Sequence, residues 1–109
     1  MVQKKSLNIL KPFLRRVKKQ FKPVNIILFG SRARGTEKKD SDYDILLVSP
    51  SFKGIDFTER CMRAYSLRRN LPIGMDILCL TPKEYFNRSK KPTLIQEISR
   101  EGKDITAIV

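Results

Sequence analysis

Histidine is absent from this sequence of 109 residues, and cysteine occurs only twice, at Cys61 and Cys79. The first absence excludes Ser-His-Asp and Cys-His catalysis and every metal site that needs a histidine ligand. The two cysteines lack the spacing of zinc ligands or of a disulfide framework, so we expect both to be buried thiols in apolar surroundings. Acid–base chemistry therefore falls to carboxylates, lysine or tyrosine.

Long hydrophobic segments and a signal sequence are also lacking. No apolar run approaches the roughly 20 residues that a transmembrane helix needs, and the short apolar stretch at 7–10 is soon followed by Lys11 and Pro12. We therefore expect a cytoplasmic protein with no membrane association. With 40% hydrophobic and 31% charged residues, residues 1–109 are expected to form one small folded domain.

Acidic residues are missing from the first third of the chain. Residues 1–36 hold ten Lys and Arg and no Asp or Glu, which places +10 of the net charge of +12 in this segment. The asymmetry indicates an anionic partner, whether nucleotide, acidic protein face or nucleic acid, or else a solvated basic helix. Nucleic acid is the least favoured of these partners, because no aromatic stacking platform accompanies the basic segment.

Hydrophobic periodicity and turn signals predict helices that alternate with strands. Pro12 fits only the first turn of a helix, so the first helix is predicted to begin between Asn8 and Lys11. A helix between the second and third strands suits a parallel crossover, whereas the short link between the first two suits an antiparallel pair. We therefore predict an α/β (α+β) domain with a mixed sheet flanked by helices. The strands are predicted at 24–29, 42–48, 73–80 and 105–109, and the later helices from Asp56 to about Asn70, from Pro82 to about Phe86 and around Leu94–Ile98.

Two aspartates stand at the head of the second predicted strand. Asp42 and Asp44 are two residues apart, so in a strand both side chains point to one face, with Cβ atoms roughly 6 to 7 Å apart. Two carboxylates this close repel one another, and a divalent cation such as Mg²⁺ between them removes the repulsion. The alternative is a Ser-Asp turn at a solvated strand start.

A glycine turn precedes this pair. Gly30 and Ser31 interrupt an apolar strand, and such a turn can present backbone N–H groups and a hydroxyl to a phosphate. It is neither a Walker A loop nor a G-x-G-x-x-G fingerprint, and an ordinary strand-to-helix turn is the alternative. A third acid, Asp76, interrupts the otherwise apolar run 73–80. A buried lone carboxylate is costly unless it is paired or binds metal, whereas the alternative is a side chain that faces solvent.

The stretch Gly30-Ser-Arg-Ala-Arg-Gly35, followed after five residues by Ser41-Asp-Tyr-Asp44, resembles the G-S-x-A-R-G-x5-S-D-x-D motif of the minimal nucleotidyltransferases. These belong to the DNA polymerase β-like nucleotidyltransferase superfamily. The resemblance implies that fold, with Asp42, Asp44 and Asp76 as catalytic metal ligands for two Mg²⁺ ions, or Mn²⁺ in their place. It also implies that Gly30 and Ser31 bind the triphosphate, while Arg34 either holds the turn or contacts phosphate.

The resemblance further implies a reaction and a partner. Members of this family commonly pair with a small helical HEPN protein in a toxin–antitoxin module, where the nucleotidyltransferase is the antitoxin and transfers AMP from ATP to its partner. The expected substrate here is ATP or another nucleoside triphosphate, and the oligomeric state is left open. The alternatives are a non-catalytic antitoxin that masks a toxin surface and a basic nucleic-acid-binding module.

Overall fold

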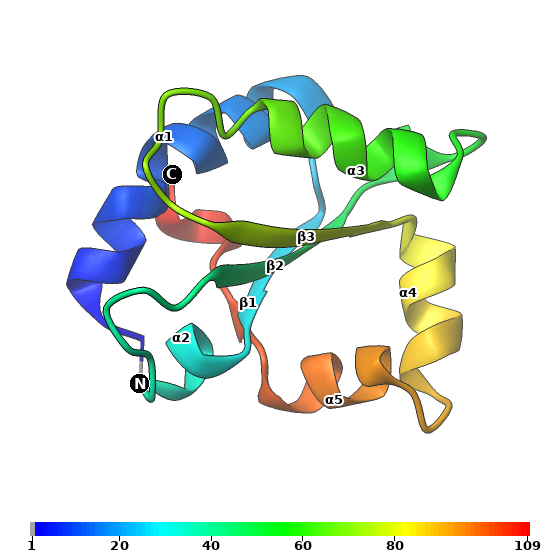
Figure 1. Cartoon of the computed structure of the whole chain (residues 1–109). Helices are drawn as coiled ribbons and strands as arrows, with labels where there is room; N and C mark the ends of the chain where they lie inside the picture. Colours follow the sequence, from blue (N-terminus) through cyan, green and yellow to red (C-terminus); the bar gives the residue numbers. More distant parts are fainter. Residues whose placement is uncertain (1) are drawn as a thin grey trace.

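A four-stranded mixed β-sheet forms the centre of the protein, seen here in a computed structural model that describes residues 2–109. The strand order is β3-β2-β1-β4, and helices lie on both sides of the sheet (Figure 1). The strands are β1 (Asn25–Phe29), β2 (Tyr43–Val48), β3 (Met75–Leu80) and β4 (Lys103–Asp104). The helices are α1 (Lys4–Phe21), α2 (Ser31–Arg34), α3 (Phe57–Ser66), α4 (Pro82–Ser89) and α5 (Leu94–Glu101), with 3-10 turns at Pro50–Phe52 and Thr106–Ile108.

The connections of the central strands are those that the sequence predicts. β1 runs antiparallel to β2 and to β4, while β2 and β3 are parallel and are joined through α3. The parallel register pairs Tyr43 with Met75 and Val48 with Leu80. The predicted class, a mixed sheet flanked by helices, is therefore confirmed.

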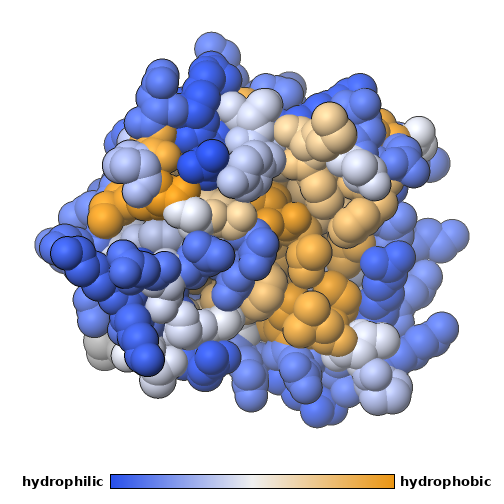
Figure 2. All heavy atoms as spheres, viewed as in Figure 1, coloured by the Kyte–Doolittle hydropathy of each residue, from blue (hydrophilic) through white to orange (hydrophobic). Residues whose placement is uncertain are grey.

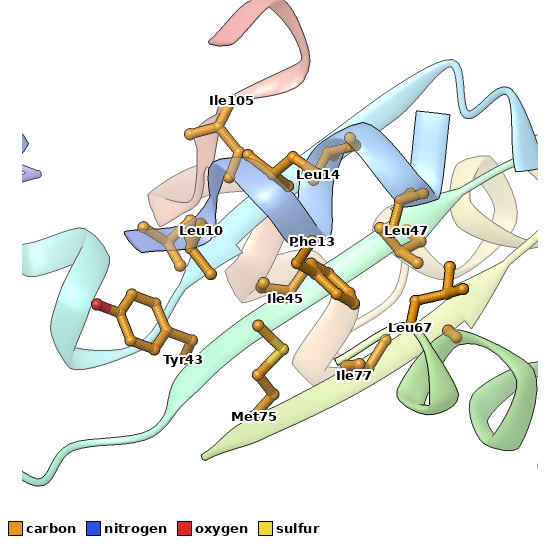
Figure 3. Close-up of a cluster of buried hydrophobic side chains, with 14 of the residues drawn as sticks. Leu10, Phe13, Leu14, Tyr43, Ile45, Leu47, Leu67, Met75, Ile77 and Ile105 are labelled. Carbon is orange, nitrogen blue, oxygen red and sulfur yellow. The ribbon is translucent and has the colours of Figure 1, made fainter. Parts of the chain in front are cut away.

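The two faces of the sheet are covered to different extents. Side chains alternate between faces along each strand, so Tyr43, Ile45 and Leu47 enter one hydrophobic core, and Leu46 and Val48 enter another. The first core lies beneath α1 and includes Leu10, Phe13 and Leu14 (Figure 3). The second core is smaller and is formed with α5 through Ile95 and Ile98.

The first helix begins earlier than predicted. α1 starts at Lys4 and runs through Pro12, which lies in its interior, so the predicted start between Asn8 and Lys11 is wrong. A proline in a helix interior costs about 3 kcal/mol. The turns before it bury Leu10 completely and pack Leu7 against the core, and burial of a leucine contributes about 1.5–3 kcal/mol for each side chain. Packing against the sheet therefore outweighs the local preference of proline.

The chain end also departs from the prediction. Residues 105–109 do not form a strand: β4 comprises only Lys103–Asp104, and a 3-10 turn follows at Thr106–Ile108. The Thr106 hydroxyl accepts a hydrogen bond from the backbone N–H of Ile26 at 2.8 Å, while Asp104 accepts one from the Thr106 N–H. These side-chain contacts replace the sheet hydrogen bonds of a longer strand.

The third helix buries a charged residue. Arg60 is only 6% exposed, and its guanidinium donates to both carboxylate oxygens of Glu84, at 2.6 and 3.3 Å. Arg60 and Ala64 are the buried residues of α3, whereas the aromatic residues Phe57 and Tyr65 are each 43% exposed. An interior ion pair can take an apolar position when every donor has an acceptor.

Two further expectations concern the cysteines and membrane-spanning helices. Cys79 is buried and Cys61 is partly buried, both as free thiols, and burial raises the pKa of the Cys79 thiol. None of the helices within residues 2–109 has the length and apolar character that a membrane span requires.

Candidate active site

Two carboxylates lie side by side at the open end of the sheet. Asp44 of β2 and Asp76 of β3 are direct partners in the parallel register. Side chains two residues apart in a strand point to the same face, so Asp44 lies on the face of Leu46 and Val48. Its partner Asp76 lies on that face too, which is the face that carries the second core. That core lies farther along the strands, so Asp44 is only partly buried and Asp76 is exposed.

The exposure of Asp76 differs from the prediction of a buried position. Its sequence neighbours are apolar because Met75 and Ile77 point into the core on the opposite face, where they are 5% and 8% exposed. A continuous apolar run does not reveal which strand residues lie beyond the edge of a covering helix. Asp76 faces solvent beside Asp44, where a ligand can reach both side chains.

Asp42 lies immediately before β2 and is exposed. Its carboxylate rests against Gly74, where a Cβ atom would overlap one oxygen and lie 3.1 Å from Cγ. The backbone N–H of Tyr43 donates to the Gly74 carbonyl at 2.9 Å, which joins the starts of β2 and β3 at this point. Gly74 is a site residue that the sequence analysis missed, because nothing in the sequence shows that it faces Asp42.

Gly30 makes room for Asp44 in a similar way. A Cβ atom at Gly30 would overlap the Asp44 carboxylate and lie 3.1 Å from its Cγ. The backbone of Gly30 has a φ of +73°, which L side chains rarely adopt. Asp44 is paired with Phe29 in the antiparallel register, so the turn leaves the sheet directly beside this carboxylate. Gly30 therefore has both a conformational and a steric role at Asp44.

The charges around Asp44 disfavour its ionised form. Burial raises the pKa of Asp44, and the neighbouring carboxylates of Asp76 and Asp42 raise it further, while the guanidinium of Arg34 acts in the opposite direction. The salt bridges within residues 2–109 are Arg60–Glu84 and Arg63–Glu59, so none of the three aspartates is neutralised by an ion pair. The three aspartates form an acidic cluster whose repulsion a cation would relieve.

The short helix α2 carries two arginines that have different contacts. The side chain of Arg32 donates to the Ser41 carbonyl at 3.0 and 2.8 Å, and its guanidinium stacks 4.1 Å over the Tyr43 ring. Arg34 is exposed and makes no side-chain hydrogen bond or ion pair within residues 2–109. The Ser31 hydroxyl also makes no hydrogen bond there. Arg32 thus holds the loop that leads into Asp42, a role the sequence analysis did not assign.

One hollow adjoins the acidic cluster at Asp44, and a second lies on the far side of the loop before β2. A pocket of about 250 Å³ lies between the glycine turn and α5, and its walls include Gly30, Arg34, Asp44 and Ile98. A larger groove of about 770 Å³ lies between the first half of α1 and the loops before β2 and β3. Because Gly30 follows β1 and Gly74 precedes β3, the pocket and the Gly74 side of the cluster lie on either side of β2.

The donor set of the cluster suits a hard divalent cation. Carboxylate oxygens are the ligands that Mg²⁺ prefers, and exposed Asp42 and Asp76 leave room for water and phosphate ligands. Within residues 2–109 no three acidic or cysteine side chains already surround one point as a metal site, because the carboxylates of Asp42 and Asp44 rest against Gly74 and Gly30. Both are the far ends of flexible side chains, so turning them requires no backbone movement.

A mixed sheet that carries three aspartates beside a glycine turn and an arginine without an ion pair suits the binding of a phosphate-bearing ligand with a divalent cation. Residues 10–105 match the family described as Nucleotidyltransferase domain. The chain therefore belongs to this family, and the resemblance to minimal nucleotidyltransferases is confirmed. No curated protein matches the chain.

Solved structures agree with this assignment at the level of the fold. A candidate nucleotidyltransferase from Sulfolobus solfataricus is 23% identical, with a TM-score of 0.66 over 92% of this chain and 78% of that one. A toxin–antitoxin structure with AMP-PNP is 24% identical, with a TM-score of 0.58 over 90% of this chain and 70% of that one. BolA1 from Arabidopsis thaliana also shares the fold, with 20% identity, a TM-score of 0.57, and coverage of 71% and 95%.

Proposed function

We propose that residues 1–109 act as one domain that transfers a nucleoside monophosphate, AMP from ATP, to a hydroxyl group on a partner protein. The observation that carries the proposal is the unneutralised cluster of Asp42, Asp44 and Asp76 beside the pocket at Gly30 and Arg34. A triphosphate with divalent cations complements such a site in charge. Mg²⁺, or Mn²⁺ in its place, would be held by the three aspartates as two ions and would neutralise charge on the transferring phosphate.

The reaction requires little covalent chemistry from the protein. The acceptor hydroxyl oxygen forms a bond to the α-phosphorus, the bond between the α-phosphorus and the α–β bridging oxygen breaks, and pyrophosphate leaves. Asp76 is exposed and next to Asp44, which supports a role for its carboxylate as the acceptor of the hydroxyl proton.

The triphosphate is assigned to the glycine turn. The Gly30 and Ser31 backbone and the Ser31 hydroxyl, which has no partner within residues 2–109, would contact the β- and γ-phosphates. Arg34 lines the same pocket without an ion pair, which favours phosphate contact over the alternative of holding the turn. The turn is held by Arg32 instead.

The acceptor is assigned to a second protein. The sheet and its covering helices use most of residues 2–109, and similarity to a toxin–antitoxin structure with AMP-PNP supports a module of that kind. The family resemblance points to a small helical HEPN toxin as the partner, in the cytoplasm, with this chain as the antitoxin. A non-catalytic antitoxin that masks a toxin surface is the second candidate.

Transfer of label from α-labelled ATP to the protein partner encoded beside this chain tests the proposal. We expect transfer with Mg²⁺, none in EDTA, and none with Asp42→Asn, Asp44→Asn or Asp76→Asn. Asp56→Asn is the matched control, because asparagine also caps a helix N-terminus and α3 is far from the turn. If the partner is bound and silenced equally by wild type and the three variants, the non-catalytic reading holds.

A further inference from the structure

We propose that the groove between α1 and the loop before β2 binds an acidic polypeptide segment of the acceptor protein and leads its hydroxyl to Asp42. This rests on the proposed function, because it names the chemistry of the acceptor for the same site. The groove is defined by the first half of α1, the loop 36–41 and the turn 71–74. Its lining includes Lys5, Arg32, Lys38, Lys39 and Ile73.

A second, smaller hollow joins the groove to Gly74. This hollow of about 160 Å³ shares Arg32, Lys39 and Ile73 with the groove and continues to Ser41 and Gly74. Gly74 is the residue against which the Asp42 carboxylate rests. A segment lying in the groove therefore has a direct path to the Gly74 side of Asp42.

This path approaches from the side of β2 opposite to the triphosphate pocket. The pocket adjoins Gly30, which follows β1, whereas the hollow adjoins Gly74, which precedes β3, and β2 lies between these two strands. Transfer to a hydroxyl requires the attacking and leaving oxygens on opposite sides of the phosphorus. Two binding sites on either side of the carboxylates provide that arrangement.

The charge of the groove selects an anionic occupant. Lys5, Lys38 and Lys39 are exposed, and none of their side chains forms an ion pair within residues 2–109. Glu37 is the one acid in the lining of the larger groove, and Asp40 is the one acid in the lining of the smaller hollow. In Figure 2 hydrophilic side chains gather over the N-terminal end of α1 and the neighbouring loop, on the left of the view. Carboxylates on a partner would complement this surface and speed its encounter.

A polypeptide fits the groove better than a nucleic acid does. Binding of single strands relies on exposed aromatic rings on which bases stack, but Tyr43, the aromatic residue of the lining, is 1% exposed and covered by Arg32. Ile9, Pro12 and Ile73 instead supply an apolar surface between the lysines, which suits the side chains of an acidic peptide.

The test measures binding of a fluorescent Glu/Tyr copolymer to the full chain by anisotropy, without nucleotide or metal. The variant Lys38→Glu/Lys39→Glu removes two groove charges, and only the backbone of these residues makes hydrogen bonds, so the fold is retained. The control Lys53→Glu/Lys83→Glu changes net charge equally at exposed positions outside the groove. We expect the Kd to rise at least tenfold for the first variant and less than twofold for the control, and to fall for Glu37→Gln.

Several results would overturn the groove assignment. One is an equal loss for both double variants, which indicates general charge attraction, and another is tighter binding of single-stranded oligonucleotide with the same dependence on Lys38 and Lys39. Copolymer binding without AMP transfer would support the groove while the proposed chemistry fails. Conversely, the chain could transfer AMP to the tyrosines of the copolymer with a KM for the copolymer that is the same in wild type and in Lys38→Glu/Lys39→Glu. That result would refute the groove assignment and leave the proposed chemistry standing.

Discussion

Substitution of three glycines by alanine separates backbone strain from steric displacement of the acidic cluster. Gly54 has a φ of +78° and open space where a Cβ would lie, Gly74 has a close approach to Asp42, and Gly30 combines a φ of +73° with a close approach to Asp44. Alanine in a left-handed conformation costs about 1–3 kcal/mol. Displacing a carboxylate at the end of a flexible side chain costs less, about 0.5–1.5 kcal/mol for an off-rotamer torsion.

The expected pattern follows from these magnitudes. Gly54→Ala should lower stability by about 1–2 kcal/mol, or about 4–9 °C in Tm, and leave AMP transfer unchanged. Gly74→Ala should lower stability by less than about 1 kcal/mol but reduce transfer sharply, because Asp42 must move. Gly30→Ala should show both effects, and its stability loss should exceed that of Gly54→Ala.

The assay is thermal or urea unfolding together with single-turnover transfer from labelled ATP. A double-mutant cycle between Gly30→Ala and Asp44→Ala isolates the steric part, since removing the carboxylate relieves the overlap but not the strain. If Gly74→Ala transfers AMP as fast as wild type, the placement of Asp42 is not important for the reaction. If Gly30→Ala and Asp44→Ala are additive in stability, the contact between these two residues carries no energy.

Three other changes have expected outcomes. Because the pKa of Asp44 is raised, its ionisation on the folded chain costs stability as pH rises above 3.8. Asp44→Asn in EDTA should therefore raise Tm at neutral pH, and the gain should shrink as pH falls toward 3.8. A lower Tm for the variant at pH 7 would contradict the repulsion. The pKa of Glu84 is lowered to about 2 from 4.5, chiefly by its hydrogen bond from Arg60, so its contribution is complete above 4.5 and is lost as pH falls toward 2. Urea unfolding of Glu84→Gln should show a loss of about 1–2 kcal/mol at pH 7, discounted for the exposed half of the pair, and a similar loss at pH 2 would refute this account. Arg32→Lys should lose about 1 kcal/mol of stability with the hydrogen bonds to the Ser41 carbonyl, and it should lower kcat for AMP transfer more than it changes ATP affinity; an unchanged kcat would exclude a role in placing Asp42.

Much of the fold could be predicted from local patterns. The runs at 24–29, 42–48 and 73–80 contain the three central strands, and the lengths of their connections predict the observed antiparallel and parallel pairs. α4 begins at Pro82 as predicted, and α5 contains the predicted segment Leu94–Ile98. These predictions succeed because caps, proline positions and short apolar runs act within a few residues, and the described fold does not oppose them there.

The motif and its spacing were also sufficient to select Asp42, Asp44 and the turn at Gly30. Alternation in a strand places the two aspartates on one face, and this depends only on backbone geometry. The family assignment over residues 10–105 agrees with the resemblance that these residues carry. The sequence by itself therefore determined the class of protein and the main candidate residues.

Tertiary structure decided what lies next to what around those residues. The register of β3 sets Asp76 opposite Asp44, the end of the covering helices leaves Asp76 exposed, and the turn before β3 brings Gly74 against Asp42. Arg32 donates to the Ser41 carbonyl, whereas Arg34 makes no such contact within residues 2–109. Both are arginines of the same motif, so the sequence does not distinguish their roles. Such contacts join segments distant in sequence or depend on side-chain direction, and they form only because the shared core holds the strands and loops in one arrangement.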